Sequence, residues 1–483
     1  MKPSLLPLLF LLSAFFYGCG QKASAPPEAE STPAAPLAAT ASQNTLPFNL
    51  PGALKAKNRD FPAENRLRKE WYEENTLVKY VKLNGDSSPG FVEATNAFSK
   101  WLTMRLSGSP LIQAGQVTPL AAAAVKAGST DPLLRYLAVR YLPEGSIGTN
   151  ELKAAYREIV DGLFDYHAMF SFYPALRGAA LLNDRELTPE HPFVVSAKKS
   201  FFQATSDRSL PPQDVYEMTS QYFDLLKRLE PNPDKAWLQI EPHLMQHWPK
   251  TAEIQLVKGR AYIDSAWKAR GSGLANTVSP QGWVKFEADL EIAEAALEKC
   301  WDLDGGNVWA ATEMLTVELG QGKGRERMEL WFDRAISMDP NNHDAAQRKL
   351  NYLSPKWYGD ELEMRQFGRE CIMNPKFGPA LATVMIHVHS QLEAYHEEET
   401  DYFKQEHVWL DIRDTYDTAI RRWPMVSRNL EYAYYASRCG KDEIALQLIA
   451  QAPKSMYGRF RNAEGLAQFK AQVEENLRRR GKL

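Results

Sequence analysis

The chain has 483 residues, of which 44% are hydrophobic and 24% charged, the composition of a protein that folds and buries a core. Lys and Arg (57) nearly balance Asp and Glu (60), which leaves a net charge of −3. A nucleic-acid binder normally carries a basic surplus, so no nucleic-acid partner is expected. Four cysteines are too few for a disulfide scaffold. This length allows about two to four ordinary domains or one extended array.

The chain begins with the pattern of a targeting segment. Lys2 precedes a run of apolar or small residues over positions 5–18. A helix of that length rises only about 21 Å, whereas the hydrocarbon core of a membrane is about 30 Å thick. Pro7 weakens a spanning helix further. Residues 1–18 are therefore predicted to be a signal peptide and not a membrane anchor.

The next question is where this segment is cleaved. Phe16-Tyr17-Gly18-Cys19 resembles a bacterial lipobox, although that motif prefers Leu at the first position and a small residue at the second. Lipidation of Cys19 would supply several acyl chains, which anchor a protein stably. Secretory cleavage after Ala25 and a cysteine without any such role remain as alternatives.

Residues 19–48 are rich in Ala, Pro, Ser and Thr, and Phe48 is their only aromatic residue. Such a segment buries too little apolar surface to offset its ordering entropy. It is predicted to be a disordered tether between Cys19 and a folded body.

From about residue 59 onward the apolar residues recur with the period of an α-helix. Three clear stretches are 287–301, 325–338 and 408–423, where apolar side chains are spaced three or four residues apart. No sustained run of β-branched residues alternates with period two. An all-α protein is therefore predicted.

The second half of the chain contains a repeat. Similar turns occur at Asp304, Asp339 and Asn374, 35 residues apart in each case. About 34 residues is the period of the tetratricopeptide helix–turn–helix unit. We therefore predict an α-solenoid of tetratricopeptide-like repeats over 211–483, with a polar insertion around 377–405. Residues 49–210 show no such period and are predicted to form an N-terminal helical subdomain.

The repeat also bears on the cysteines. Cys300 and Cys371 hold nearly equivalent places two repeats apart. Packed helices lie about 8–10 Å apart, so about 20 Å should separate these sites, whereas a disulfide needs Cα atoms within about 7 Å. Cys300, Cys371 and Cys439 are all expected to be unpaired.

Four segments carry a resemblance to a known family. They are Trp248-Pro249-Lys250-Thr251-Ala252, Ala266-Trp267-Lys268-Ala269-Arg270-Gly271, Pro355-Lys356-Trp357-Tyr358-Gly359 and Arg428-Asn429-Leu430-Glu431-Tyr432-Ala433. Over roughly residues 210–470 the chain resembles a bacterial family classed as a domain of unknown function, whose members are similar to tetratricopeptide proteins. The resemblance implies a helical-repeat fold and carries no activity or functional residue across.

Two short patterns were weighed as chemical sites. His389, Glu393 and His396 share one helix face and could ligate zinc, but the His-Glu-x-x-His pattern is absent and a solvated face is the plainer interpretation. Ser196-Ala197-Lys198-Lys199 matches Ser-x-x-Lys of penicillin-recognising enzymes without the other elements of that site. No catalytic residue, metal ligand or cofactor is therefore predicted.

The aromatic residues are more informative. Ten of the twelve tryptophans lie between positions 237 and 423, and most occupy core-like helical positions. Two groups combine aromatic and basic side chains, the residue types that dominate interface hot spots. These groups are Trp267 with Arg270, and Lys356, Trp357 and Tyr358, and they are the candidate partner-binding residues. A local cation–π contact or a capping role is the plainer interpretation of each group.

The sequence thus predicts a non-catalytic scaffold that binds a protein partner. It would be lipid-anchored in the bacterial cell envelope, at the periplasmic face of the outer membrane. One alternative is an envelope enzyme, such as a wall hydrolase, with its site in residues 59–210. Another is an assembly factor of a secretion or outer-membrane complex. An open aromatic groove would favour the scaffold, and polar residues clustered around a deep pocket would favour the enzyme.

The lipobox-like sequence makes a direct prediction. A Cys19→Ala variant should lose acyl labelling and accumulate as the uncleaved precursor, because the lipidation pathway needs the thiol. Metabolic labelling with a palmitate analogue and mass spectrometry of the N-terminus measure both effects. Normal processing of the variant would instead indicate cleavage after Ala25.

Overall fold

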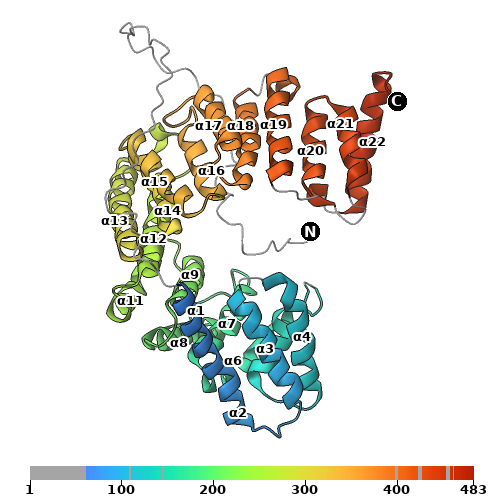
Figure 1. Cartoon of the computed structure of the whole chain (residues 1–483). Helices are drawn as coiled ribbons and strands as arrows, with labels where there is room; N and C mark the ends of the chain where they lie inside the picture. The colour runs from blue at the N-terminus through green and yellow to red at the C-terminus, as the bar shows by residue number, and fades with distance from the viewer. Residues whose placement is uncertain are drawn as a thin grey trace.

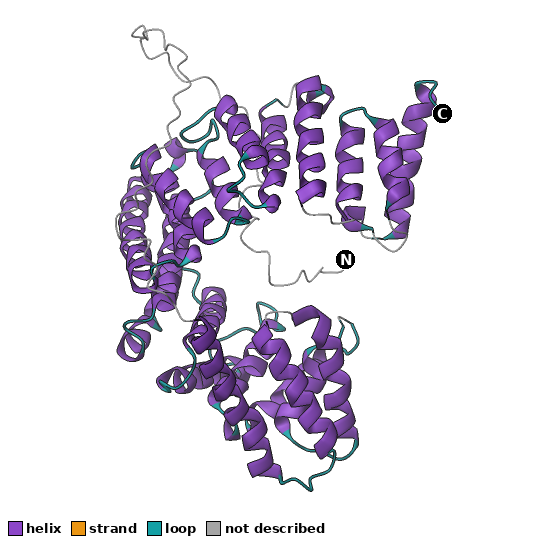
Figure 2. Cartoon of the chain, in the orientation of Figure 1, coloured by secondary structure: helices purple, strands orange, loops and turns teal. Residues whose placement is uncertain are grey.

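A computed structural model describes residues 61–107, 110–143, 145–396, 401–422, 427–452, 457–460 and 462–483. These residues form helices joined by turns and loops, and no strand occurs among them (Figures 1 and 2). The all-α prediction is confirmed. The predicted signal peptide, Cys19 and the predicted tether lie outside the described residues.

In the N-terminal half each helix packs mainly on the next one in the sequence. The α-helices are α1 (Phe61–Glu73), α2 (Lys79–Asn84), α3 (Phe91–Ser107), α4 (Pro110–Lys126), α5 (Pro132–Arg140), α6 (Thr149–Val160), α7 (Ala168–Ala180), α8 (Pro192–Ser206) and α9 (Pro212–Leu229). A π-helical turn, Glu74–Val78, joins α1 to α2. The pairs α3–α4, α4–α5, α6–α7 and α7–α8 are in contact, which buries the apolar stripe of each helix.

The C-terminal half continues as helix hairpins. Its α-helices are α10 (Pro233–Leu238), α11 (Glu241–His247), α12 (Ala252–Arg270), α13 (Pro280–Asp304), α14 (Val308–Gln321), α15 (Arg325–Met338), α16 (His343–Tyr352), α17 (Glu361–Met373), α18 (Val384–Tyr395), α19 (Glu406–Arg422), α20 (Ser427–Arg438), α21 (Asp442–Gln451) and α22 (Ala463–Arg479). The stripes predicted within 287–301 and 325–338 are buried, among them Leu297, Trp301, Met328 and Phe332.

The two clearest turns of the 35-residue spacing have the same local geometry. Asn307 is the N-cap of α14 and accepts a hydrogen bond from the backbone N–H of Ala310, and Asn342 caps α16 by the same bond from Ala345. An asparagine side chain at this position satisfies an N–H that has no partner inside the helix. The spacing therefore marks equivalent hairpin turns, and the tetratricopeptide assignment itself stays a prediction.

The stretch 377–405, predicted to be a polar insertion, is not polar throughout its described residues. It contains a 3₁₀ turn, Pro379–Thr383, and α18, which packs on α16, α17 and α19. Met385, Val388 and Leu392 form the buried stripe of α18. The interspersed histidines and glutamates made this helix look more polar than its buried face is.

Figure 1 shows that the chain bends, with α12 and α13 at the bend and α13 on its outer side. Helices α12, α14 and α16 are in contact in that order. Because the chain reverses direction at each hairpin turn, these three helices run the same way. Their C-terminal ends therefore lie at the same edge of the array, where the loops after α12, α14 and α16 meet.

The predicted boundary at 210/211 falls just before α9, which packs on α7 and α8 as well as on α10 and α12. Helix α9 thus packs on helices from both sides of the predicted boundary. The division into two domains stays a prediction. Cys300, Cys371 and Cys439 are buried, and none of them forms a disulfide with another described residue, as expected from the repeat.

A buried ion cluster fixes α9 to the first helices. Asp214 of α9 is fully buried and accepts hydrogen bonds from Arg68 of α1 at 2.9 and 3.0 Å, from Arg105 of α3 at 2.9 Å and from the Tyr72 hydroxyl at 2.6 Å. Glu217 bonds Arg105 at 2.5 Å and so balances the second positive charge. Burial opposes ionisation of Asp214, yet the two arginines hold its pKa below the usual range. Their stabilisation is therefore present above about pH 4 and is lost as the pH falls through the lowered pKa.

Breaking this cluster should be costly. Asp214→Asn leaves two buried guanidinium groups short of negative charge, and the free energy of unfolding should fall by about 3–5 kcal/mol. Urea denaturation followed by circular dichroism measures the loss. The control is Asp414→Asn in the exposed Arg413–Asp414 pair, which should change stability by less than about 1 kcal/mol. Equal effects of the two substitutions would contradict the structural role of Asp214.

Candidate functional site

The two predicted aromatic–basic groups meet at one edge of the array. Trp267 lies in the last turn of α12, and Trp357 lies in the loop that follows α16. Their ring centroids are 5.7 Å apart at an interplanar angle of 79°. Edge-to-face contacts at this distance are a favourable arrangement of two aromatic rings. Segments about 90 residues apart in sequence thus form one site.

Arg270 lies among three tryptophan rings. Its guanidinium carbon is 5.7 Å from the ring centroid of Trp267, 5.4 Å from that of Trp357 and 5.9 Å from that of Trp283. Each distance is within the range of a cation–π contact. The Nη1 atom donates to the carbonyl oxygens of Gly271 and Gly273, at 3.1 and 3.2 Å, so the loop after α12 fixes one corner of the group.

Sequence reasoning missed two members of this site, Trp283 and Phe286. Both lie near the start of α13, whose Ser279 N-cap and Pro280 fix the entry into the helix. Phe286 packs on Trp267 at 5.2 Å and on Trp283 at 5.7 Å. The available signal was a Trp and a Phe three residues apart in the first two turns of α13, which follows the loop after Arg270.

Tyr358 joins the same edge through the backbone of α14. Its hydroxyl donates to the Leu319 carbonyl oxygen at 3.1 Å, and its ring lies 4.6 Å from that of Tyr352. Gly322 has φ +62° and leaves room for this tyrosine, because a Cβ there would lie 2.6 Å from the hydroxyl oxygen. Lys356, the remaining predicted residue, is exposed at the start of this segment.

We call this site the edge cluster, and its members are Trp267, Arg270, Trp283, Phe286, Trp357 and Tyr358. It has more hydrogen-bond donors than acceptors. The indole N–H groups of Trp267 and Trp357 are buried and have no acceptor among the described residues. Burial lowers the pKa of Arg270, and among the described residues no acidic side chain forms a salt bridge with it.

A second group of charged residues crosses α12, α14 and α16. Glu313 of α14 is buried between Arg260 of α12 at 2.8 Å and Arg348 of α16 at 2.9 Å. We call these three residues the charged ladder. Arg260 also stacks on Trp309, which is 51% exposed at the start of α14. The two arginines hold the pKa of Glu313 low against the opposing effect of burial. The charge of Glu313 is balanced within the charged ladder, which connects three successive hairpins.

The residues weighed as zinc ligands are engaged elsewhere. His389 is fully buried between the Tyr402 hydroxyl at 2.9 Å and Asp411 at 3.2 Å, so the interpretation of a solvated face is wrong for it. Glu393 bonds Arg438, and His396 bonds Glu361. In the part of the chain that the structure describes, no three His, Cys, Asp or Glu residues are grouped so that they could hold a metal ion.

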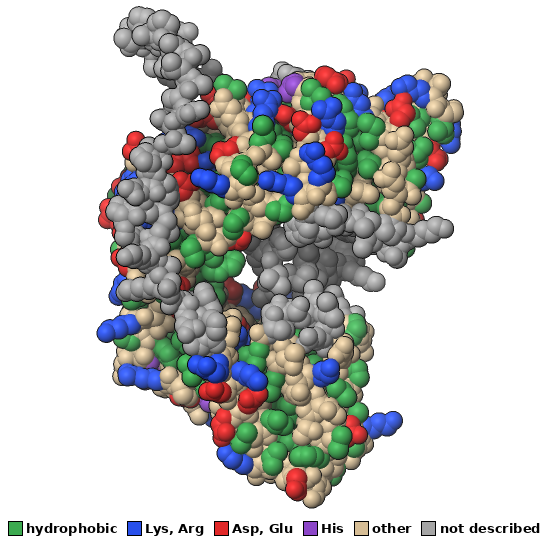
Figure 3. Space-filling view, viewed as in Figure 1, with side chains coloured by type: hydrophobic (Ala, Val, Ile, Leu, Met, Phe, Trp, Pro, Cys, Tyr) green, Lys and Arg blue, Asp and Glu red, His purple; other side chains and the backbone are tan. Residues whose placement is uncertain are grey.

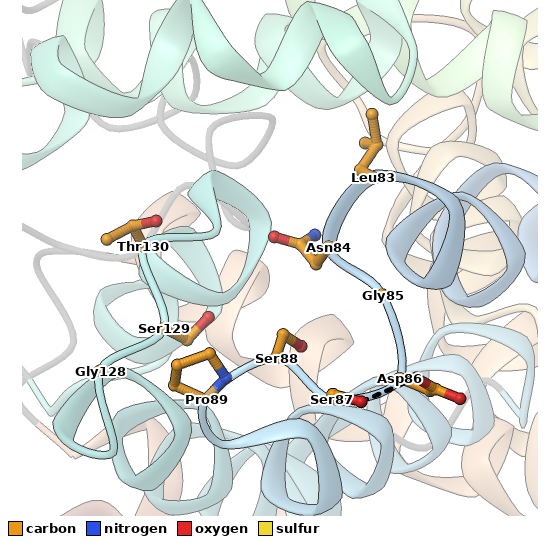
Figure 4. A pocket seen from close by; sticks show the side chains of 10 residues that line it. All are labelled: Leu83, Asn84, Gly85, Asp86, Ser87, Ser88, Pro89, Gly128, Ser129 and Thr130. Atoms are coloured by element: carbon orange, nitrogen blue, oxygen red, sulfur yellow. Dashed lines mark hydrogen bonds between the residues drawn. The ribbon is translucent and has the colours of Figure 1, made fainter.

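One cavity lies in the region where a hydrolase site was considered. It has a volume of about 500 Å³ and lies between residues 83–89 and 128–130 (Figure 4). Asn84 bonds Asp131, and Ser88 bonds Tyr80. Asp86 is the only titratable residue that lines it. Ser87 donates a hydrogen bond to Asp86 at 3.1 Å, and among the described lining residues no second carboxylate and no histidine, lysine or cysteine accompanies this pair. The Ser196 pattern gives no site either, because the Lys199 ammonium lies over the Phe164 ring.

Comparison with protein-family models and with curated proteins finds no match for this chain. The resemblance to a tetratricopeptide-like family of unknown function therefore stays a prediction. Among the described residues, no helix combines the length and the apolar character needed to cross a membrane.

Proposed function

We propose that this chain is a helical-repeat scaffold that binds a protein partner at the edge cluster. The observation that carries the proposal is the convergence of Trp267 and Arg270 with Trp357 and Tyr358. Tryptophan, tyrosine and arginine are the residues most enriched at the centres of protein interfaces. The two aromatic–basic groups were identified separately in the sequence by this composition, and they form one cluster.

The surroundings of the edge cluster support a binding role. Leu274, in the loop after α12, is 60% exposed, and Val284, beside Trp283, is 69% exposed. Tyr358 is 45% exposed. Apolar side chains that protrude around an aromatic centre provide area that a partner can cover. Elsewhere, on the face shown in Figure 3, acidic and basic side chains are interspersed.

We also propose that the scaffold acts in the bacterial cell envelope, held there by lipidated Cys19 through the segment 19–48. The support for this location is the apolar segment that ends in Gly18-Cys19. A tethered scaffold needs only an exposed surface for binding, and Leu274, Val284 and Tyr358 provide one around the edge cluster.

Site-specific photocrosslinking tests the proposed function. Benzoylphenylalanine at position 274, next to the edge cluster, should give a discrete adduct with a partner protein in cells that express the chain naturally. The control is the same probe at position 195, since Val195 of α8 is 50% exposed but distant in the sequence from the cluster. Adducts are measured by gel shift and mass spectrometry. An adduct at 195 and none at 274 would contradict the proposal.

A further inference from the structure

We propose that the edge cluster binds a carboxylate of an acidic, apolar segment of the partner protein, with Arg270 as the residue that holds it. This inference rests on the proposed function and adds the chemistry of the partner. Its starting point is the charge of Arg270, with which no acidic side chain among the described residues forms a salt bridge.

The remaining donors of Arg270 have the geometry that a carboxylate needs. A guanidinium group carries five N–H donors in a planar fork. The carbonyl oxygens of Gly271 and Gly273 accept hydrogen bonds from Nη1. Nε and Nη2 present two parallel N–H bonds along another side of the group, and this side matches the two oxygens of a carboxylate.

A second arginine in a similar setting shows what is particular to Arg270. The guanidinium carbon of Arg334 in α15 lies 4.2 Å from the Trp331 ring centroid and 5.0 Å from that of Trp301. Burial lowers the pKa of both arginines, but Asp302 and Glu298 act against that shift at Arg334. At Arg270 burial alone lowers the pKa, and no acidic group opposes it. Negative charge is thus already present near Arg334 and is missing at Arg270.

The neighbours of Arg270 fit the rest of such a segment. Leu274, Val284 and Tyr358 offer exposed apolar surface, and Lys356 adds a second exposed positive charge nearby in the loop. A carboxylate flanked by large apolar residues would complement this combination. A carboxylate moved from water into a partly desolvated aromatic site is stable only when it is paired, which gives the contact specificity for acidic segments.

Selection from a random peptide library tests the inference. The full chain is used as bait, with peptides displayed both internally and with a free C-terminus. The selected peptides should carry Asp, Glu or a terminal carboxylate next to large apolar residues. By isothermal titration, Arg270→Gln should weaken binding of the best synthetic peptide at least tenfold, and replacing its acid by the amide should do the same.

Two further variants separate binding from folding. Arg270→Lys keeps the charge and loses the fork, so its affinity should fall between those of the wild type and Arg270→Gln. Arg334→Gln removes a similar arginine–tryptophan contact and should bind the peptide like the wild type. Circular dichroism and thermal melting check that each variant is folded.

Several outcomes would overturn the inference. Selection of peptides that lack acidic groups would overturn it, and so would equal binding of a peptide to the wild type and to Arg270→Gln. Both results would leave the proposed scaffold function intact. If the wild-type chain binds no peptide and the probe at position 274 gives no adduct, the result would instead count against the proposed function. Arg270-dependent binding to anionic phosphatidylglycerol vesicles without binding to any peptide would replace the partner protein by a membrane. An adduct at position 274 with a second copy of this chain would replace it by self-association.

Discussion

Each helix of this protein has an apolar stripe that it cannot bury alone, so it packs that stripe against the helices next to it in the sequence. In the C-terminal half this constraint produces a regular reversal of chain direction. The Asn307 and Asn342 caps set equivalent turns 35 residues apart, and α12, α14 and α16 run parallel in one row. The position of every loop follows from that row, including the loops that contain Arg270 and Trp357.

The same constraint explains why the edge cluster combines residues from distant segments. Trp267, Gly322 and Trp357 each lie at or just beyond the C-terminal end of a helix in the row. If a hairpin were added or removed between α12 and α16, Trp357 would no longer reach Trp267. At the N-terminal side the Asp214 cluster has a comparable role, since α9 is held to α1 and α3 while it also packs on α12.

Much of the fold could be predicted from the sequence because helical periodicity and turn residues are local signals. The 287–301 stripe and the absence of a disulfide among the described cysteines are examples. The buried face of α18 was missed because His387, His389 and Glu393 masked its apolar stripe, and the burial of His389 depends on its contact with Asp411 of another helix. For the site, composition identified Trp267, Arg270, Trp357 and Tyr358. Their convergence, and the inclusion of Trp283 and Phe286, depends on tertiary packing that spacing alone does not specify.

The central claim is that the segments around Trp267 and Trp357 form one cluster at the edge of the array. A double-mutant cycle with Trp267→Leu and Trp357→Leu, measured by urea denaturation, tests it most directly. An edge-to-face pair at 5.7 Å should give a coupling energy of about 0.5–1.5 kcal/mol, so the double variant should be less destabilised than the sum of the single ones. A coupling energy of zero, with both single variants folded, would show that the two segments do not meet.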